Sequence, residues 1–331
     1  MEFIERTKLE QGFAEVFDRD VRPRLMALDE ERIERLGKAR KWVAMGVAGT
    51  AALIALIVLV FGVEGFGLFA AIAIGMFGFI GVWALRASQA SGWGHSVAET
   101  VMPAICRHVG DLTFTKSGGY FPLGEFRDLR LVGSYSKSDL SNQLDGTHRG
   151  TKFEVVEAHL TSKSRNSKGS TTTTTVFKGL LFHIAVPMAV PAPIMIARDR
   201  GALGNKLGEM FSFGGGGRSM PKVEFDHAGF ESAFEVYSDD PDGARRIMPP
   251  AFLDSLIAIG TSEGGRKGTK AMVAGFNGES FYLALSRSGG FMEMGKLTKP
   301  VIEMEDDLHN IFSDIEIVHR IIDRLHGIDP E

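Results

Sequence analysis

The last predicted helix carries four polar side chains whose types could bind a metal or move a proton. Glu316, His319, Asp323 and His326 follow one another at intervals of three, four and three residues, so a helix places them along one face. Glu-x-x-His is the helical half-site of carboxylate-bridged di-iron bundles, which need matching motifs on other helices. No second predicted helix supplies one. We therefore expect a solvated or structural face with local histidine–carboxylate pairs, with no cofactor and no metal, and these four residues are the candidates for a site.

Other motifs that carry chemistry are weak. The stretch Gly264–Lys270 resembles a phosphate-binding loop, but its residue order and the strand predicted after it do not place amides and a lysine around a phosphate. The four glycines Gly214–Gly217 lack the spacing of a dinucleotide fingerprint. Cys106 is the single cysteine and excludes an intramolecular disulfide, and His183 on a predicted strand is expected to be structural. The sequence shows no enzyme signature.

Two long uncharged runs, Trp42–Val63 and Gly65–Leu85, are separated by Glu64. The first would form a helix of roughly 33 Å, and the apolar core of a bilayer is about 30 Å thick. A core helix of a soluble protein would show a polar stripe, and neither run does. The sequence therefore predicts a transmembrane hairpin over 42–85. Small residues recur every fourth position in both helices, which favours packing within the hairpin, with self-association between chains as the alternative: Ala44, Ala48, Ala52, Gly67, Ala71 and Gly75.

The charges around this hairpin predict its orientation. Basic residues precede the first run and Arg86 follows the second, whereas the turn carries only Glu64. The positive-inside rule then places both termini in the cytoplasm, so we expect a multi-pass protein of the bacterial inner membrane with the lipid bilayer as a partner. The whole chain is nearly neutral, with 37 basic and 41 acidic residues, which argues against nucleic acid as a partner.

The sequence divides into four parts. Residues 1–41 are predicted to form an amphipathic helical arm, interrupted at Pro23, whose apolar face docks either on a membrane or partner or on the protein's own soluble domain. Residues 42–85 form the hairpin, 86–110 a helical connector, and 111–331 a cytoplasmic domain.

The cytoplasmic domain has the pattern of an α+β fold with a mostly antiparallel sheet. Strands are expected at Leu112–Thr115, Phe126–Tyr135, Lys152–Leu160, Thr173–Val186, Val223–Phe225 and Phe234–Tyr237. The polar stretch Thr161–Thr175 reads as a long hairpin tip. Asn277-Gly278 predicts a type I′ turn between strands Lys270–Phe276 and Glu279–Ser286. Helices are expected at about Pro250–Ile259 and Asp306–Leu325, the latter closing the domain.

Three segments resemble a bacterial membrane-protein family catalogued as domain of unknown function 3137. They are VRPRLMALDEERIERLGKARK before the hairpin, VFKGLLFHIAVP at Val176–Pro187 and AFEVYSDDPDGARRIMPPAFLDSL at Ala233–Leu256. The resemblance implies a membrane-anchored bacterial protein over most of the chain. It brings no activity and no catalytic residues to carry over, and Arg246-Ile247 departs from its pattern.

Two functional hypotheses follow. In the first, the chain is a non-enzymatic module that binds a protein or a lipid head group at the inner face of the membrane. In the second, it is a membrane-associated enzyme of unrecognised type with the histidine and carboxylate face of the C-terminal helix as its site.

Overall fold

A computed structural model describes residues 2–62, 64–165, 169, 171–198, 220–262, 269–288 and 290–328. The stretches Gly264–Lys270 and Gly214–Gly217 lie wholly or mostly outside these residues. The chain divides into two compact units, one of residues 1–108 and 293–310 and the other of residues 109–292 and 311–331.

The first unit begins with an arm that packs on its own chain. After a 3-10 turn (Lys8–Glu10), α1 (Phe13–Val16) and a π-helical turn (Phe17–Val21) lead into α2 (Arg22–Phe61), which has Pro23 in its first turn. Phe13, Phe17 and Val21 are fully buried, and the Phe13 ring lies 5.2 Å from those of Phe3 and His108. These apolar residues of the arm are therefore buried within the first unit.

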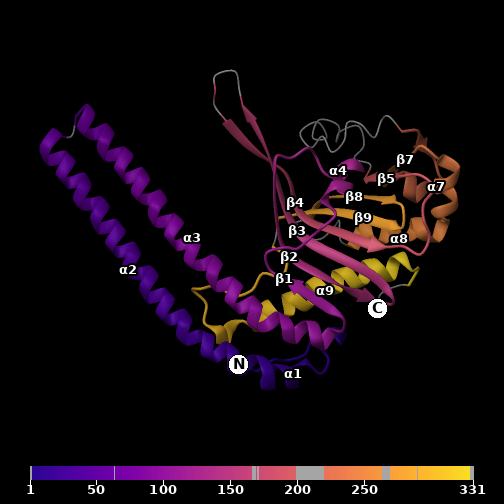
Figure 1. Ribbon diagram of the computed structural model, residues 1–331, viewed down its shortest axis with the longest axis horizontal. Helices are drawn as coiled ribbons and strands as arrows, with labels where there is room; N and C mark the ends of the chain where they lie inside the picture. The colour runs from indigo at the N-terminus through magenta and orange to yellow at the C-terminus, as the bar shows by residue number, and fades with distance from the viewer. Residues whose placement is uncertain are drawn as a thin grey trace. The chain divides into compact units, whose positions relative to one another are not determined.

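Two helical segments, Phe13–Phe61 and Phe66–Ala84, are long and apolar enough to cross a membrane by length and composition. The second belongs to α3 (Phe66–Val109), which runs beside α2 (Figure 1). Of the most apolar window, 0% is buried in the first and 6% in the second, which differs from the burial of a core helix.

The two helices approach at glycines. A Cβ at Gly46 would lie 2.9 Å from Val82, one at Gly78 would overlap Thr50, and Gly75 faces Ile54. Of the predicted ladder residues only Gly75 is among these three, and self-association between chains stays a prediction.

The second unit is built on a nine-stranded sheet in the order β1-β2-β3-β4-β9-β8-β5-β7-β6, with antiparallel pairing throughout its described strands. The strands are β1 (Leu112–Thr115), β2 (Lys137–His148), β3 (Thr151–Arg165), β4 (Thr171–Ala185), β5 (Ile194–Arg198), β6 (Lys222–Val223), β7 (Phe234–Ser238), β8 (Thr269–Asn277) and β9 (Ser280–Arg287). The predicted α+β class and antiparallel sheet are confirmed.

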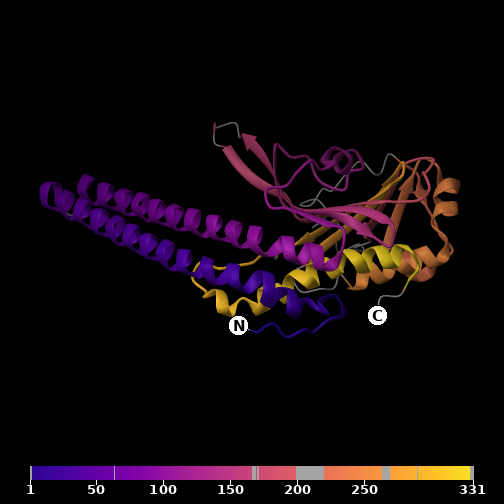
Figure 2. The ribbon, with the colours of Figure 1, turned by 60° about the horizontal axis from the view of Figure 1, so that its bottom comes forward.

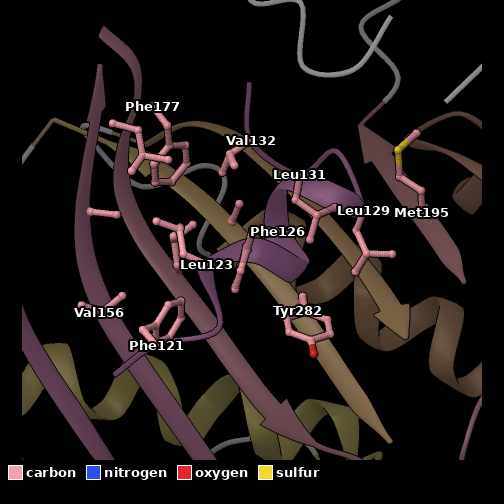
Figure 3. Close-up of a cluster of buried hydrophobic side chains, with 14 residues drawn as sticks. Phe121, Leu123, Phe126, Leu129, Leu131, Val132, Val156, Phe177, Met195 and Tyr282 are labelled. Atoms are coloured by element: carbon pink, nitrogen blue, oxygen red, sulfur yellow. The ribbon is translucent and has the colours of Figure 1, made fainter. Parts of the chain in front are cut away.

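Helices lie on both faces of this sheet (Figure 2). They are α4 (Leu123–Asp128), α6 (Ala228–Glu231), α7 (Pro241–Ile247), α8 (Pro250–Ser262) and α9 (Glu305–Leu325). A 3-10 turn at Val301–Glu303 belongs to the first unit. Under α4, Phe126 and its neighbours pack on alternate residues of β3, β4 and β9 (Figure 3). Helix α9 lies against the other face of the sheet (Figure 2), and its Ile315, Val318 and Ile322 are buried.

Three predictions about this sheet were wrong. Thr161–Thr175 is not one long hairpin tip, because 161–165 is the end of β3, 171–175 is the start of β4, and these two segments pair with each other. Phe126–Tyr135 alternates like a strand, but Leu123–Asp128 is helical, and Phe126, Leu129 and Leu131 fill the small core of Figure 3. The hairpin at Asn277 exists, but Asn277 pairs with Ser280, and positive φ occurs at Gly278, the first of the two loop residues. That is the pattern of a type II′ turn rather than type I′.

Candidate functional site

The four candidate residues, three on α9 and His326 directly after it, each have a different set of partners. Asp323 is 8% exposed and accepts hydrogen bonds from His148 Nε2 (2.7 Å) and Arg149 Nε (2.6 Å), at the end of β2 and the turn that follows. Burial alone would raise the pKa of the Asp323 carboxyl, but the hydrogen bonds from Arg149 and His148 and their charges outweigh it and lower the pKa. Asp323 is a carboxylate that ties α9 to the β2–β3 hairpin.

His319 lies next to this ion pair. Its ring stacks on that of His148, with centroids 3.9 Å apart and an interplanar angle of 9°. Burial, followed by the charge of His148, lowers the pKa of His319 to about 4, against the smaller opposing effect of Asp323. A neutral imidazole packed face to face on another ring is therefore the state of His319 at neutral pH.

The remaining two candidates point elsewhere. Glu316 forms an ion pair with Arg320 on the same helix (3.5 Å), and His326 Nε2 lies 2.8 Å from Thr151 Oγ1. Among the residues that the structure describes, no three His, Cys, Asp or Glu side chains are arranged to hold a metal ion. The helical spacing thus placed the four residues on one flank without bringing them into one site.

His326 and Thr151 also form the polar edge of an apolar pocket of about 290 Å³. Its walls come from the end of β4 and the segment after it, from α7, α8 and β8, and from Ile322 and Leu325 of α9. A volume of this size is at the lower limit for small-ligand pockets.

A larger pocket, of about 640 Å³, lies in the first unit, where the uncharged run of α2 begins. One wall is a single face of α2, formed by Leu36, Ala39, Arg40, Val43 and Ala44 at helical spacing. The other wall is the segment Gly295–Thr298. Because the uncharged stretch begins at Trp42, this pocket lies at the boundary between the charged and the uncharged part of α2.

The facing segment is held by specific contacts. Gly295 has φ +71° and its N–H donates to Asp307 Oδ2 (3.1 Å). Arg32 Nη1 donates to the carbonyl of Leu297 (3.4 Å) and its Nε to Asp29 (2.6 Å). The buried guanidinium of Arg32 therefore fixes this wall to α2.

The pocket has a basic and apolar lining. Arg40 and Lys296 are exposed cations from its two walls, and its lining residues include no carboxylate. Such a lining attracts an anionic phosphate group while its apolar residues contact the carbons attached to it. Arg40 was visible in the sequence only as a charge flanking the hairpin. Lys296 had no signal, because the chain brings it to α2 from more than 250 residues away.

The chain was compared with curated proteins, solved structures and protein families. No curated protein matches the chain. A solved structure that matches is the crystal structure of the mycobacterial trehalose monomycolate transport factor A, which shares 10% sequence identity and covers 66% of this chain and 90% of that one, with a TM-score of 0.28. At that score the similarity carries no argument about fold or function.

The family model described as a protein of unknown function, DUF3137, matches residues 175–326. This range contains two of the three segments on which the resemblance was based, Val176–Pro187 and Ala233–Leu256, and also α9 and Lys296. The segment before the hairpin lies outside it. Residues 175–326 of the chain are thus similar to the family of domain of unknown function 3137.

Proposed function

We propose that this chain is a membrane-anchored module that binds the head group of an anionic lipid at the cytoplasmic face of the inner membrane. The observation that carries the proposal is the pocket of about 640 Å³ whose two cations, Arg40 and Lys296, stand where the apolar run of α2 begins. The hairpin over 42–85 would place that pocket at the depth of lipid phosphates.

The exposed surface of the hairpin supports the membrane part of this proposal. Large apolar side chains such as Leu59, Phe69 and Phe79 are 83%, 73% and 73% exposed. A contiguous apolar surface of this kind is unfavourable in water and favourable in lipid. The basic flanks against a turn with only Glu64 support an orientation with both termini in the cytoplasm.

The alternative of an enzyme at the α9 face gains no support from these contacts. Asp323 accepts hydrogen bonds from His148 and Arg149, and the uncharged ring of His319 is stacked on His148. Those interactions connect elements of the fold, and we treat the face as structural.

Native mass spectrometry of the full-length protein in detergent tests the head-group proposal. Phosphatidylglycerol should remain bound where phosphatidylcholine does not. Each cation near a membrane surface contributes about 1 kcal/mol, so the double variant Arg40→Gln/Lys296→Gln should bind phosphatidylglycerol roughly 10- to 30-fold more weakly.

The matched control is Lys299→Gln, which removes one cation from the same segment outside the pocket lining. It should bind like the wild type. Equal affinity of wild type and double variant, or equal retention of the two lipids, would contradict the proposal, and so would a co-purifying protein that occupies the pocket in place of lipid.

A further inference from the structure

One row of directly opposed residues crosses four neighbouring strands on the sheet face that also carries α4. Asp145 on β2 pairs with Glu154 on β3, Glu154 with His183 on β4, and His183 with Tyr282 on β9. Ser280 lies two residues before Tyr282, so its side chain points to the same face. Strand register thus brings an alcohol, an imidazole and carboxylates together on one surface.

Three of these side chains form a hydrogen-bonded chain. His183 Nδ1 lies 2.9 Å from Glu154 Oε2, and His183 Nε2 lies 2.9 Å from Ser280 Oγ. An ionised carboxylate can only accept, so Nδ1 must carry the proton that it donates to Glu154. Nε2 is then the ring atom with the free lone pair, and it accepts the hydroxyl proton of Ser280.

This is the order in which a serine nucleophile, a histidine base and an orienting carboxylate act in hydrolases of unrelated folds. Such constellations are recognised by geometry and role rather than by position in the chain. Here each member comes from a different strand of a rigid sheet, and the hydrogen bonds fix the tautomer that a general base requires.

Tyr282 adds a donor. Its ring stacks on that of His183, with centroids 5.1 Å apart and an interplanar angle of 10°, which holds the imidazole in place. Burial raises the pKa of the phenol, and the negative charges of Glu125 and Glu154 add to this, against a hydrogen bond with Ser280 that lowers it. The hydroxyl therefore stays protonated at neutral pH and can donate to an oxyanion.

The hydrogen-bonded side chains of Glu154, His183 and Ser280 are accessible to solvent. The side chains of His183 and Glu154 are 27% and 35% exposed. Ser280 is half-buried, and Ala185, which pairs with it, is exposed. A small molecule can reach the hydroxyl from outside, while the neighbouring Tyr282 is 5% exposed.

We propose that Ser280 is the nucleophile of an acyl-transfer reaction on small carboxylic esters, with His183 as the general base and Glu154 as a positioning residue. Ser280 Oγ forms a bond to the ester carbonyl carbon, its proton passes to His183 Nε2, and the carbonyl oxygen becomes an oxyanion that Tyr282 stabilises. The bond to the alkoxide leaving group then breaks, and His183 returns the proton to it, giving an alcohol and acyl-Ser280. Water, deprotonated by His183, releases the carboxylic acid in the same way. This site is separate from the head-group pocket, and neither proposal depends on the other.

The experiment is covalent labelling of the full-length protein with a fluorophosphonate, which reacts with activated serines. We expect one adduct, located by peptide mass spectrometry at Ser280. Ser280→Ala should abolish it, and His183→Gln should slow it at least 100-fold, as is usual for loss of a general base. Ser286→Ala is the control, because Ser286 lies on the same strand and its hydroxyl donates to the carbonyl of Lys178 (3.3 Å).

Glu154 is tested by rescue. Glu154→Gln should slow labelling at least tenfold, and Glu154→Asp, which keeps a carboxylate, should recover part of that loss at an equal unfolding temperature. The position of the wild-type adduct needs no variant, so poor folding of a mutant does not leave the proposal untested. An unlabelled wild-type Ser280, an adduct on another serine, or an unchanged rate in His183→Gln would overturn it.

Discussion

Replacing His319 with Gln should flatten the dependence of stability on pH between 6.5 and about 4. In the folded protein, burial and the charge of the stacked His148 lower the pKa of His319 to about 4 from its ordinary 6.5, with a smaller lowering from Arg149 and an opposing effect from Asp323. Below pH 6.5 the unfolded chain binds a proton at this histidine that the folded chain does not. The contribution of this group to stability therefore decreases as the pH is lowered from 6.5 to about 4, and it stays constant below that.

The size of the effect follows from the width of that window. Each pH unit contributes up to about 1.4 kcal/mol, so the loss is at most about 3.5 kcal/mol, or roughly 7 to 14 °C in unfolding temperature for a domain of this size. His319→Gln removes the titrating group and also the stack on His148, which is worth about 0.5–1.5 kcal/mol. The variant should be slightly less stable than the wild type at pH 7.5 and equal or more stable near pH 4.5.

Thermal unfolding of the full-length protein in detergent, at half-unit steps from pH 7.5 to 4.5, measures this. His326→Gln is the matched control, because His326 directly follows α9 and is exposed, and its profile should run parallel to the wild type. If His319→Gln also runs parallel to the wild type, the folded protein does not hold a buried neutral imidazole at this position and the reasoning fails.

Three further predictions concern the rest of the chain. Replacing Ser162–Thr174 by a short turn should change the unfolding temperature by only a few degrees. The paired strand ends there carry exposed or half-buried polar side chains, and loop-closure entropy depends weakly on length. A larger loss would show that the segment packs on another part of the protein. Gly78→Val should lower the unfolding temperature through overlap with Thr50, whereas Gly81→Val, with open space around its Cβ, should not; equal effects would argue against close packing of the two helices. A reporter fused after Glu331 should behave as cytoplasmic, and a periplasmic signal would contradict the proposed topology.

Sequence patterns predicted those elements whose residues carry their own signal. The two uncharged runs, the alternation in β3 and β4, and the apolar stripe of α9 all occur close to where they were expected. Strand β2 was missed because Lys137–His148 contains few apolar residues and has a bulge at Asn142, where φ is +51°. The amide of Asn142 bonds to Glu157 Oε2 and to the carbonyl of Phe291, so tertiary contacts rather than local pattern stabilise that conformation.

The chemistry of the sheet surface was hidden for a different reason. Glu154, His183 and Ser280 are separated by 29 and 97 residues, and no spacing rule applies to residues joined by strand register. His183 alone, beside Phe177 and Leu181, looked structural, and its hydrogen bonds to Glu154 and Ser280 do support the sheet. The two roles do not exclude each other, because a base that is held rigidly is also a better base. The two roles differ in the reactivity that they predict for Ser280. If the hydrogen bond is purely structural, Ser280 is as unreactive as an ordinary alcohol. If His183 is a general base, its imidazole accepts the hydroxyl proton as the oxygen attacks. The position of the fluorophosphonate adduct separates the two.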